Sequence, residues 1–306
     1  MYNGENKDFG AIMTYYLTVE EKKKEDAKED KKEDNEDEEK ENGAEDEKEE
    51  TKVKWDSIYL KVYNGDKLIR TLSQKTPDST GFHKMRWFMD EKGADRPSRK
   101  IRKDNNREPG GVSVKPGTYK IVMEYGDQSS EASITVKSDP RLEVSQKNID
   151  EVYTASHKLE DMQQKAADAV KQLAESVEIA TKYQKDLQKW DKKKYKEEIK
   201  ASKEIIKKAD SIIDIYVGKE DKRQGITRNP EVTVMQRLGT AGYYTGSRQN
   251  GLTATEEQLI KQASDALKDA LNTTNTFFTM EWKTYRERME KLEVSPFKET
   301  KQFSMD

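Results

Sequence analysis

The chain has 306 residues, enough for two domains of ordinary size, and 32% of them are hydrophobic, which suffices for two modest cores. It contains no cysteine, which excludes disulfides, thiol catalysis and cysteine metal sites. The net charge of −3 is unevenly distributed. Residues 20–52 contain 18 acidic residues and 9 lysines, so the rest of the chain carries a dispersed positive charge of about +6.

These features limit the classes of partner. Nucleic-acid binders carry a clustered basic stripe, and the dispersed excess in this chain does not form one. No apolar run approaches the ~20 residues that span a bilayer, and the first residues lack the basic and apolar regions of a secretory signal. We therefore expect no nucleic-acid partner and no membrane span, while the residues alone leave the compartment open.

The first predicted element is a strand, because residues 9–19 are rich in β-branched and aromatic types. In the acidic segment that follows, ordering the backbone would cost entropy with no burial to offset it. We interpret residues 20–52 as a disordered loop inserted between two strands. The alternative is an acidic tract that binds cations or a partner, but its lysines are interspersed and no calcium-loop spacing is present.

Alternating apolar residues predict further strands up to residue 136. Asn64-Gly65 is a strong hairpin signal, Gly126-Asp127 is a second turn, and residues 90–115 predict a long loop rich in glycine, proline and charge. The strand at residues 82–89 places Met85, Trp87 and Met89 on one face, with Trp87 expected in the core. Together with residues 82–89, five more segments make six short predicted strands, which is typical of an antiparallel sandwich. These five segments are residues 9–19, 57–63, 67–72, 118–123 and 132–136.

The period changes from two to helical after Asp139-Pro140-Arg141, since proline cannot continue a strand ladder. Apolar residues then recur every seven positions and predict one buried face on a long helix. They are Val152, Leu159, Ala166, Leu173, Ala180 and Leu187, widened by Met162, Val170 and Val177. A second stripe, shifted in phase by one, indicates a break near Trp190 and Asp191; it comprises Tyr195, Ile199, Ser202, Ile206, Ala209, Ile213 and Tyr216.

Glycine and capping signals delimit the remaining helices. Gly218 ends the second helix, and Asn229-Pro230 predicts the start of a short helix that reaches Leu238. After a stretch rich in glycine and tyrosine at residues 239–251, Thr253 and Glu256 predict a capping box. The third long helix carries an apolar stripe and ends at Ser295-Pro296; the stripe comprises Leu259, Ala263, Ala266, Ala270, Phe277, Trp282, Tyr285, Met289 and Leu292.

The predicted fold class is therefore α+β. We expect an antiparallel β-sandwich in residues 1–139, with the acidic insertion at 20–52, and an antiparallel bundle of three helices in residues 140–306.

The search for chemistry gives no catalytic, cofactor-binding or metal-binding residue. The only histidines, His83 and His157, fall in different predicted domains without partners at metal or triad spacing, so a structural role is favoured for both. Nucleophile elbows, phosphate-binding loops, dinucleotide fingerprints and zinc motifs are absent from the sequence. Gly110-Gly111 precedes a predicted strand and not a helix, which argues against a phosphate site. The many carboxylates make any pair of them uninformative.

One aromatic group is the candidate contact site for a ligand or partner, namely Tyr243, Tyr244 and Arg248. The favoured interpretation is a loop that packs its tyrosines against the end of the bundle. Asn272-Thr273-Thr274 matches a glycosylation acceptor but lies in a predicted helix. The aromatic residues from Phe277 to Tyr285 have helical spacing, which is typical of bundle core rather than of a sugar platform.

Several segments resemble a known family. They are LKVYNGDKLIRTL, the tryptophan at position 87 and VKPGTYKIVMEYGDQSSEASITVKSDPR, together with the opening YNGENKDFGAIMTYYL and the closing SPFKETKQF. This pattern is similar to the immunoglobulin-like sandwich and helical bundle that follow the β-propeller in exported sortilin-like, sialidase-repeat proteins of Bacteroidota. The propeller and its aspartate-box repeats are missing from this chain, so no residue here inherits the function of a propeller.

The resemblance implies an immunoglobulin-like sandwich and an exported setting, which is periplasmic, on the outer-membrane surface or secreted. It also implies the C-terminal part, or a separate subunit, of a propeller protein. We expect a non-catalytic module for protein interaction or assembly, whose partner is another protein chain, with a β-propeller as the class that the resemblance suggests. The alternatives are an accessory part of a glycan or peptide hydrolase and a carbohydrate-binding sandwich marked by exposed coplanar aromatics.

Overall fold

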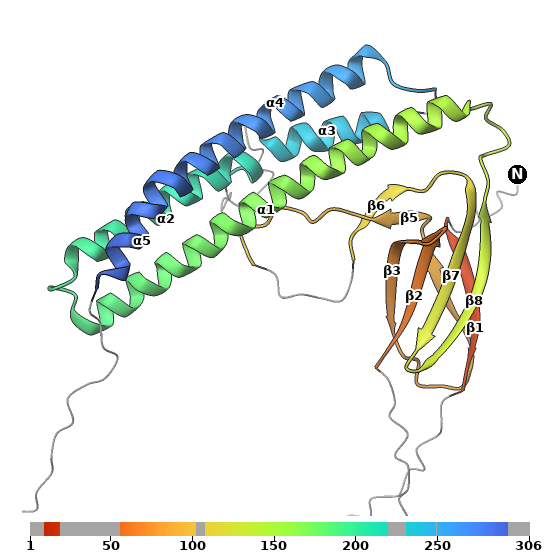
Figure 1. Cartoon of the computed structure of the whole chain (residues 1–306), viewed down its shortest axis with the longest axis horizontal. Helices are drawn as coiled ribbons and strands as arrows, with labels where there is room; N and C mark the ends of the chain where they lie inside the picture. Colours follow the sequence, from red (N-terminus) through yellow and green to blue (C-terminus); the bar gives the residue numbers. More distant parts are fainter. Residues whose placement is uncertain (1–8, 19–55, 102–107, 220–230, 249, 293–306) are drawn as a thin grey trace, which may run out of the picture. The chain divides into compact units, whose positions relative to one another are not determined.

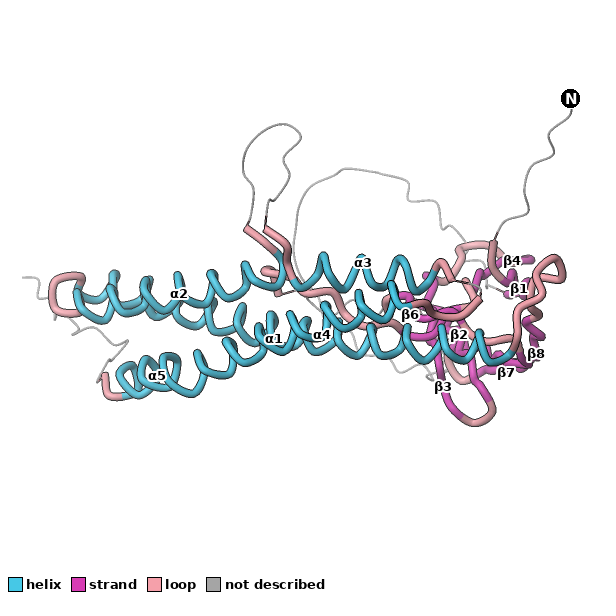
Figure 2. Tube along the Cα trace, turned by 90° about the horizontal axis from the view of Figure 1, so that it is seen from above, coloured by secondary structure: helices cyan, strands magenta, loops and turns pink. Residues whose placement is uncertain are grey.

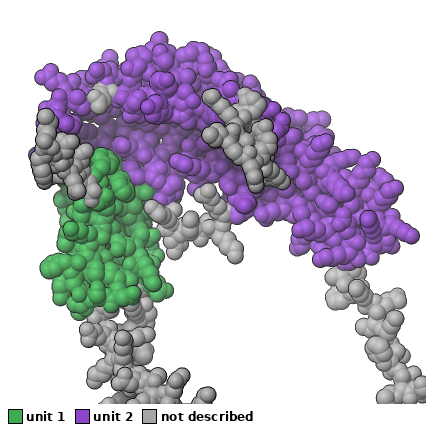
Figure 3. Space-filling view, turned by 180° about the vertical axis from the view of Figure 1, so that it is seen from behind, with its two compact units in different colours: residues 1–89, 118–136 green, residues 90–117, 137–306 purple. Residues whose placement is uncertain are grey.

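The computed structural model describes residues 9–18, 56–101, 108–219, 231–248 and 250–292, and the predicted acidic insertion at 20–52 lies outside these ranges. The chain divides into two compact units, coloured separately in Figure 3. We call residues 1–89 with 118–136 the sheet unit, and residues 90–117 with 137–306 the helical unit. Antiparallel sheets and helices together confirm a mixed α and β composition.

The sheet unit contains two antiparallel sheets (Figure 1). Alternation of apolar side chains directs one side of each sheet inward, as the sequence predicted. One sheet has two strands, β1 (Ala11–Leu17) and β4 (Gly81–Trp87). The other has four in the order β3-β2-β7-β8, which are β3 (Lys67–Lys75), β2 (Ser57–Asn64), β7 (Gly117–Tyr125) and β8 (Gln128–Val136).

Glycines at positive φ form the two predicted turns of this unit. Gly65 (φ 58°) connects β2 to β3 and Gly126 (φ 56°) connects β7 to β8, both in the left-handed region that glycine adopts without steric cost. Both turn predictions are therefore confirmed.

The core of the sheet unit joins its two sheets. The indole of Trp87 on β4 is fully buried and meets the ring of Tyr119 on β7 edge to face, with 5.5 Å between ring centroids. Burial of Met85 and Trp87 confirms two of the three residues predicted for one strand face. Met89 lies beyond the end of β4 with φ at 57°, so its placement on that strand face was wrong.

Residues 90–117 differ from the predicted long loop. They contain two short paired strands, β5 (Asp90–Lys92) and β6 (Gly110–Ser113), and belong to the helical unit. The glutamine side chains of α1 (Gln146–Asp191) hold the segment after β5, because Gln163 donates to the carbonyls of Ala94 and Asp95 (both 3.2 Å). Arg99 then reaches Asp214 and the carbonyl of Gly218, so the segment also touches the end of a second helix.

The helices of the second unit lie side by side along α1 (Figures 1 and 2). α2 (Lys196–Val217) and α3 (Val234–Gly246) follow one another along α1, and the chain then returns through α4 (Ala254–Thr276), the π-helical segment η1 (Phe277–Trp282) and α5 (Lys283–Glu290). The predicted break after Asp191 is confirmed, since its carboxylate accepts hydrogen bonds from the next turn. The end of α2 at Gly218 is confirmed as well.

The predicted stripes form one shared core. Every heptad position on α1 from Leu159 to Leu187 is buried, and most of the second stripe is buried against it. Two hydroxyl pairs cross this core: Ser202 with Tyr285 (3.0 Å) and Tyr216 with Thr274 (2.8 Å). Because a buried hydroxyl without a partner is costly, these pairs favour a single alignment of α2 against the returning helices.

The spacing of the buried residues explains why η1 is π-helical. Up to Phe277 the buried residues follow ordinary helical spacing, but the next buried ones, Tyr285 and Met289, are displaced by one position from that series. A π-helical turn holds one extra residue and absorbs this slip. The sequence predicted the stripe and missed the change of helix type.

Candidate functional site

The two histidines have different surroundings. His83, on β4 of the sheet unit, donates from Nε2 to the carbonyl of Ser79 (2.9 Å), and its ring lies beside that of Tyr15. His157, on α1, lies between two carboxylates, with 3.6 Å from Nε2 to Glu91 and 3.5 Å from Nδ1 to Glu160. The sequence did not predict this second grouping.

A small polar cluster therefore joins β5 to α1. Tyr153 donates its hydroxyl to Glu91 and packs edge to face against His157, with 4.4 Å between ring centroids. Burial raises the pKa of Glu160, and the neighbouring His157 opposes that rise. Acids, an imidazole and a phenol in one place are the groups that proton transfer requires.

The backbone of β6 packs on one side of this cluster. A Cβ atom added at Gly111 would lie 2.5 Å from Glu160 Oε1, so the strand packs directly on that carboxylate, while the side chain of His157 stays 33% exposed. Lys115 continues the contact, with its ammonium 2.9 Å from Asp150 and 4.9 Å from the ring of Tyr153. The cluster thus holds the β5–β6 ribbon on α1, and Gly111 permits the close approach.

The predicted ligand group, Tyr243, Tyr244 and Arg248, lies at the end of α3. The helix extends through the stretch that was predicted to be irregular, so the packed-loop interpretation was wrong: Tyr243 is 74% exposed and Tyr244 45%. Their rings meet edge to face. Arg248 pairs instead with buried Glu256 (2.9 Å), so the structure does not bring its charge to the tyrosines as a shared site.

The predicted capping box at the start of α4 is confirmed, because Glu256 accepts from the backbone N–H of Thr253 (2.9 Å). Hydrogen bonds from Thr253 and Arg248 lower the pKa of Glu256 to about 2. The start of α3 differs from its prediction. Asn229-Pro230 lies outside the described residues, and the helix begins with Thr233 as its N-cap.

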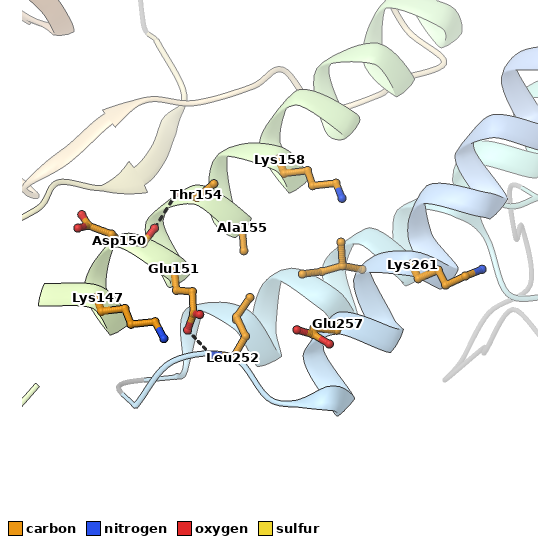
Figure 4. Close-up of a pocket in the computed structure, with 10 residues that line it drawn as sticks. Lys147, Asp150, Glu151, Thr154, Ala155, Lys158, Leu252, Glu257 and Lys261 are labelled. Atoms are coloured by element: carbon orange, nitrogen blue, oxygen red, sulfur yellow. Dashed lines mark hydrogen bonds between the residues drawn. The ribbon is translucent and has the colours of Figure 1, made fainter. Parts of the chain in front are cut away.

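A groove of about 830 Å³ opens between α1 and the start of α4 (Figure 4). Its apolar floor is formed by Ala155, Leu252 and Ile260, and charged side chains stand around its rim. Glu151 accepts from the backbone N–H of Leu252 (3.4 Å), which ties the crossing segment to α1. The volume lies in the range of ligand pockets, and no sequence pattern predicts the groove because its walls are about 100 residues apart.

Exposed hydrophobic side chains of the described sheet unit gather on the outer side of β1 and β4, which we call the aromatic face. Tyr16 pairs with Phe82 across the strands, and they are 59% and 77% exposed. The same side carries Ile12 (45% exposed) opposite Arg86. Phe9 and Phe88, at 67% and 50% exposed, lie next to the ends of these strands. Such concentrations of exposed aromatics mark contact surfaces more often than scattered single residues do.

A signal for this face exists in the sequence. The inward set of β1 is Met13, Tyr15 and Leu17, and two of its three outward residues, Ile12 and Tyr16, are large and hydrophobic, with Thr14 between them. A strand with one solvated side would carry polar residues at the outward positions. The outward aromatics do not form a sugar platform, because the rings of Tyr16 and Phe82 meet at 70° and Trp87 is buried.

Among the described residues, no group of three acidic or histidine side chains could hold a metal ion, and no described helix is long and apolar enough to cross a membrane. Comparisons of the chain with protein-family models, curated proteins and solved structures find no match.

Proposed function

We propose that the chain is a non-catalytic module for protein interaction or assembly, and that it docks another protein chain on the aromatic face. The observation that carries the proposal is the exposed pair Tyr16 and Phe82 on the outer side of β1 and β4, which also carries Ile12 beyond the polar pair Thr14 and Lys84. Aromatic and arginine side chains supply most of the binding energy in protein interfaces, and this face holds both kinds, with the polar pair Thr14 and Lys84 between the aromatic pair and Arg86.

We also propose the finer classification of the two units. The two sheets packed through Trp87 and Tyr119 support the proposal of an immunoglobulin-like sandwich, and the helices packed along α1 support that of an antiparallel three-helix bundle. The proposed setting is an exported assembly with a β-propeller as its partner, which rests on the sequence resemblance. The cluster around His157 holds the β5–β6 ribbon on α1, which favours a structural role over a hydrolase site, and the tilted rings on the aromatic face do not favour a carbohydrate-binding module.

The proposal is tested by direct binding. The immobilised wild-type chain is used to isolate a stoichiometric partner from the source cells, and the purified partner is then titrated calorimetrically against variants. The double variant Tyr16→Thr with Phe82→Thr keeps residues that favour strands and removes both exposed rings. Loss of two hot-spot side chains predicts binding that is at least ~30-fold weaker.

A matched control is Met280→Gln, which removes an apolar side chain that is 63% exposed on η1 of the helical unit. This variant should bind the partner as the wild type does. A monomeric chain that retains no stoichiometric partner would overturn the proposal. Binding to a glycan array that the Tyr16 and Phe82 substitutions abolish would favour the carbohydrate alternative, and hydrolysis of a glycan or peptide panel would favour the hydrolase.

A further inference from the structure

One edge of strand β1 has no strand paired with it. Among the residues that the structure describes, β1 forms backbone hydrogen bonds only with β4, in a sheet of two strands. Its inward residues Met13 and Tyr15 are only partly buried, which fits a strand at the open edge of a sheet. This edge of β1 therefore presents backbone N–H and C=O groups that can pair with a strand of another chain.

The composition of β1 leaves this edge unprotected. Natural sheets protect exposed edge strands with charged residues or with proline. The partner strand β4 has this protection, because it carries Lys84 and Arg86 within seven residues. β1 (Ala11–Leu17) has no charged residue and no proline. Of the two strands, β1 is therefore the one that favours the addition of a further strand.

The outer side of the β1–β4 sheet selects the side chains of an occupant. Three cross-strand pairs lie on it, namely Ile12 with Arg86, Thr14 with Lys84, and Tyr16 with Phe82. These six positions hold two cations and no carboxylate, and both rings of the aromatic pair are largely exposed. A strand with apolar and acidic side chains complements this side in both polarity and charge.

Thr14 determines where an acidic side chain fits. A strand added beside β1 lies two strand spacings from β4, or about 10 Å. Because Thr14 on the intervening strand is short, the exposed side chain of Lys84 can extend over it towards the added strand. A glutamate opposite Thr14 meets that ammonium, and the residues two positions before and after the glutamate face Ile12 and Tyr16.

From this geometry we infer that β1 binds an extended strand of a partner protein, in which an acidic residue has an apolar residue two positions away on each side. The strand pairs with the backbone of β1, extends the sheet to three strands and lays these three side chains over the aromatic face. The inference rests on the proposed function, since it names the docking mode and the partner chemistry of the same face. A second copy of the chain fits less well, because β1 has Thr14 and not an acid between Ile12 and Tyr16.

The test uses the full chain and a fluorescently labelled peptide of about nine residues, with a central glutamate, a valine two positions away on each side, and threonine elsewhere to favour the strand. Anisotropy titration should show saturable binding. Lys84→Glu should weaken it about fivefold, because an exposed ion pair becomes a repulsive pair. A peptide with lysine in place of the glutamate should restore binding to that variant. The matched control Lys67→Glu makes the same charge change at an exposed position of β3, in the other sheet, and should bind the original peptide as the wild type does.

N-methylation of the peptide tests the backbone pairing. In a strand the N–H groups of alternate residues point to the same edge, so methylating one alternate set removes the donors that face β1, and methylating the other set removes those that face solvent. One methylated peptide should bind at least ~10-fold more weakly, and the other should bind like the unmodified peptide.

Each of four results would overturn the inference. They are no saturable binding by the folded wild type, equal affinity of the two methylated peptides, equal weakening by Lys84→Glu and Lys67→Glu, and a wild-type dimer that the peptide dissociates, which would identify a second copy as the occupant. The proposed function fails separately, because it depends on isolating a partner that the Tyr16 and Phe82 substitutions release. A partner lost through those substitutions, together with equal binding of both methylated peptides, would retain the docking face and exclude the added strand.

Discussion

Trp87→Ala tests whether the two units are energetically separate. The Trp87 side chain is completely buried, and burial of an aromatic side chain removes ~150–250 Å² from water, or about 4–6 kcal/mol at ~25 cal/mol per Å². Substitutions of buried aromatics by alanine cost about 3–5 kcal/mol in practice. A domain is stable by only ~5–15 kcal/mol, so this loss is a large fraction of the stability of the sheet unit.

Hydrogen exchange followed by mass spectrometry measures the effect in each unit. Where exchange occurs through unfolding of the sheet unit, a loss of ~3–5 kcal/mol accelerates it by about two to four orders of magnitude in peptides from β2, β3 and β7. Peptides from α1 should exchange as in the wild type. Leu173→Ala, which removes a fully buried side chain of α1, is the matched control and should accelerate exchange only in the helical unit.

Equal acceleration in both units by either variant would refute the reasoning, because it would show that the chain unfolds as one cooperative body. Unchanged exchange in β2 and β7 of the Trp87→Ala variant would show that the indole does not hold the two sheets together.

Three further predictions concern single residues. Hydrogen bonds from Thr253 and Arg248 lower the pKa of Glu256 from 4.5 to about 2. The stabilising contribution of the ionised Glu256 is therefore complete above pH 4.5 and is lost as the pH falls towards 2. The difference in Tm between the wild type and Glu256→Gln should shrink across that interval. Thr233→Ala removes the N-cap of α3 and should cost about 1 kcal/mol in urea unfolding, whereas Thr233→Ser should cost less. Gly65→Ala meets no atom within 4 Å but places a side chain at φ 58°, so it should destabilise the sheet unit by about 1–2 kcal/mol in urea unfolding, and Gly65→Asn by less.

Local patterns in the sequence predicted the elements whose signals repeat. Leu159, Leu173 and Leu187 are buried because a seven-residue spacing returns to one side of a helix, whatever the helix packs against. The hairpin at Gly65 follows from a backbone conformation that glycine adopts readily. These predictions needed no knowledge of distant contacts.

Elements defined by tertiary contacts were missed. α3 contains Gly239 and Gly242, which weaken a helix, yet Leu238 and Ala241 on the same helix are buried against its neighbours and this packing outweighs the propensity. Strands β5 and β6 have only three and four residues, too few to show alternation.

The candidate sites were missed for a similar reason. Glu91 meets His157 across 66 positions of sequence, and the walls of the groove are about 100 residues apart, so no spacing rule connects them. The only sequence signal for the aromatic face is a strand with large hydrophobic residues on both sides.

The distribution of charge explains why interaction and not catalysis is the proposed function. Where acids and an imidazole come together, around Glu91, His157 and Glu160, the backbone of Gly111 packs on Glu160 and the interactions of the group hold a ribbon on α1. Catalysis requires such groups beside an open space that excludes water but admits a substrate. The outer side of β1 and β4 carries a different combination, since Tyr16 and Phe82 are exposed there and the cations Lys84 and Arg86 lie on the same side of the sheet. Exposed rings with cations beside them are typical of surfaces that contact another protein, which is why interaction is the function proposed.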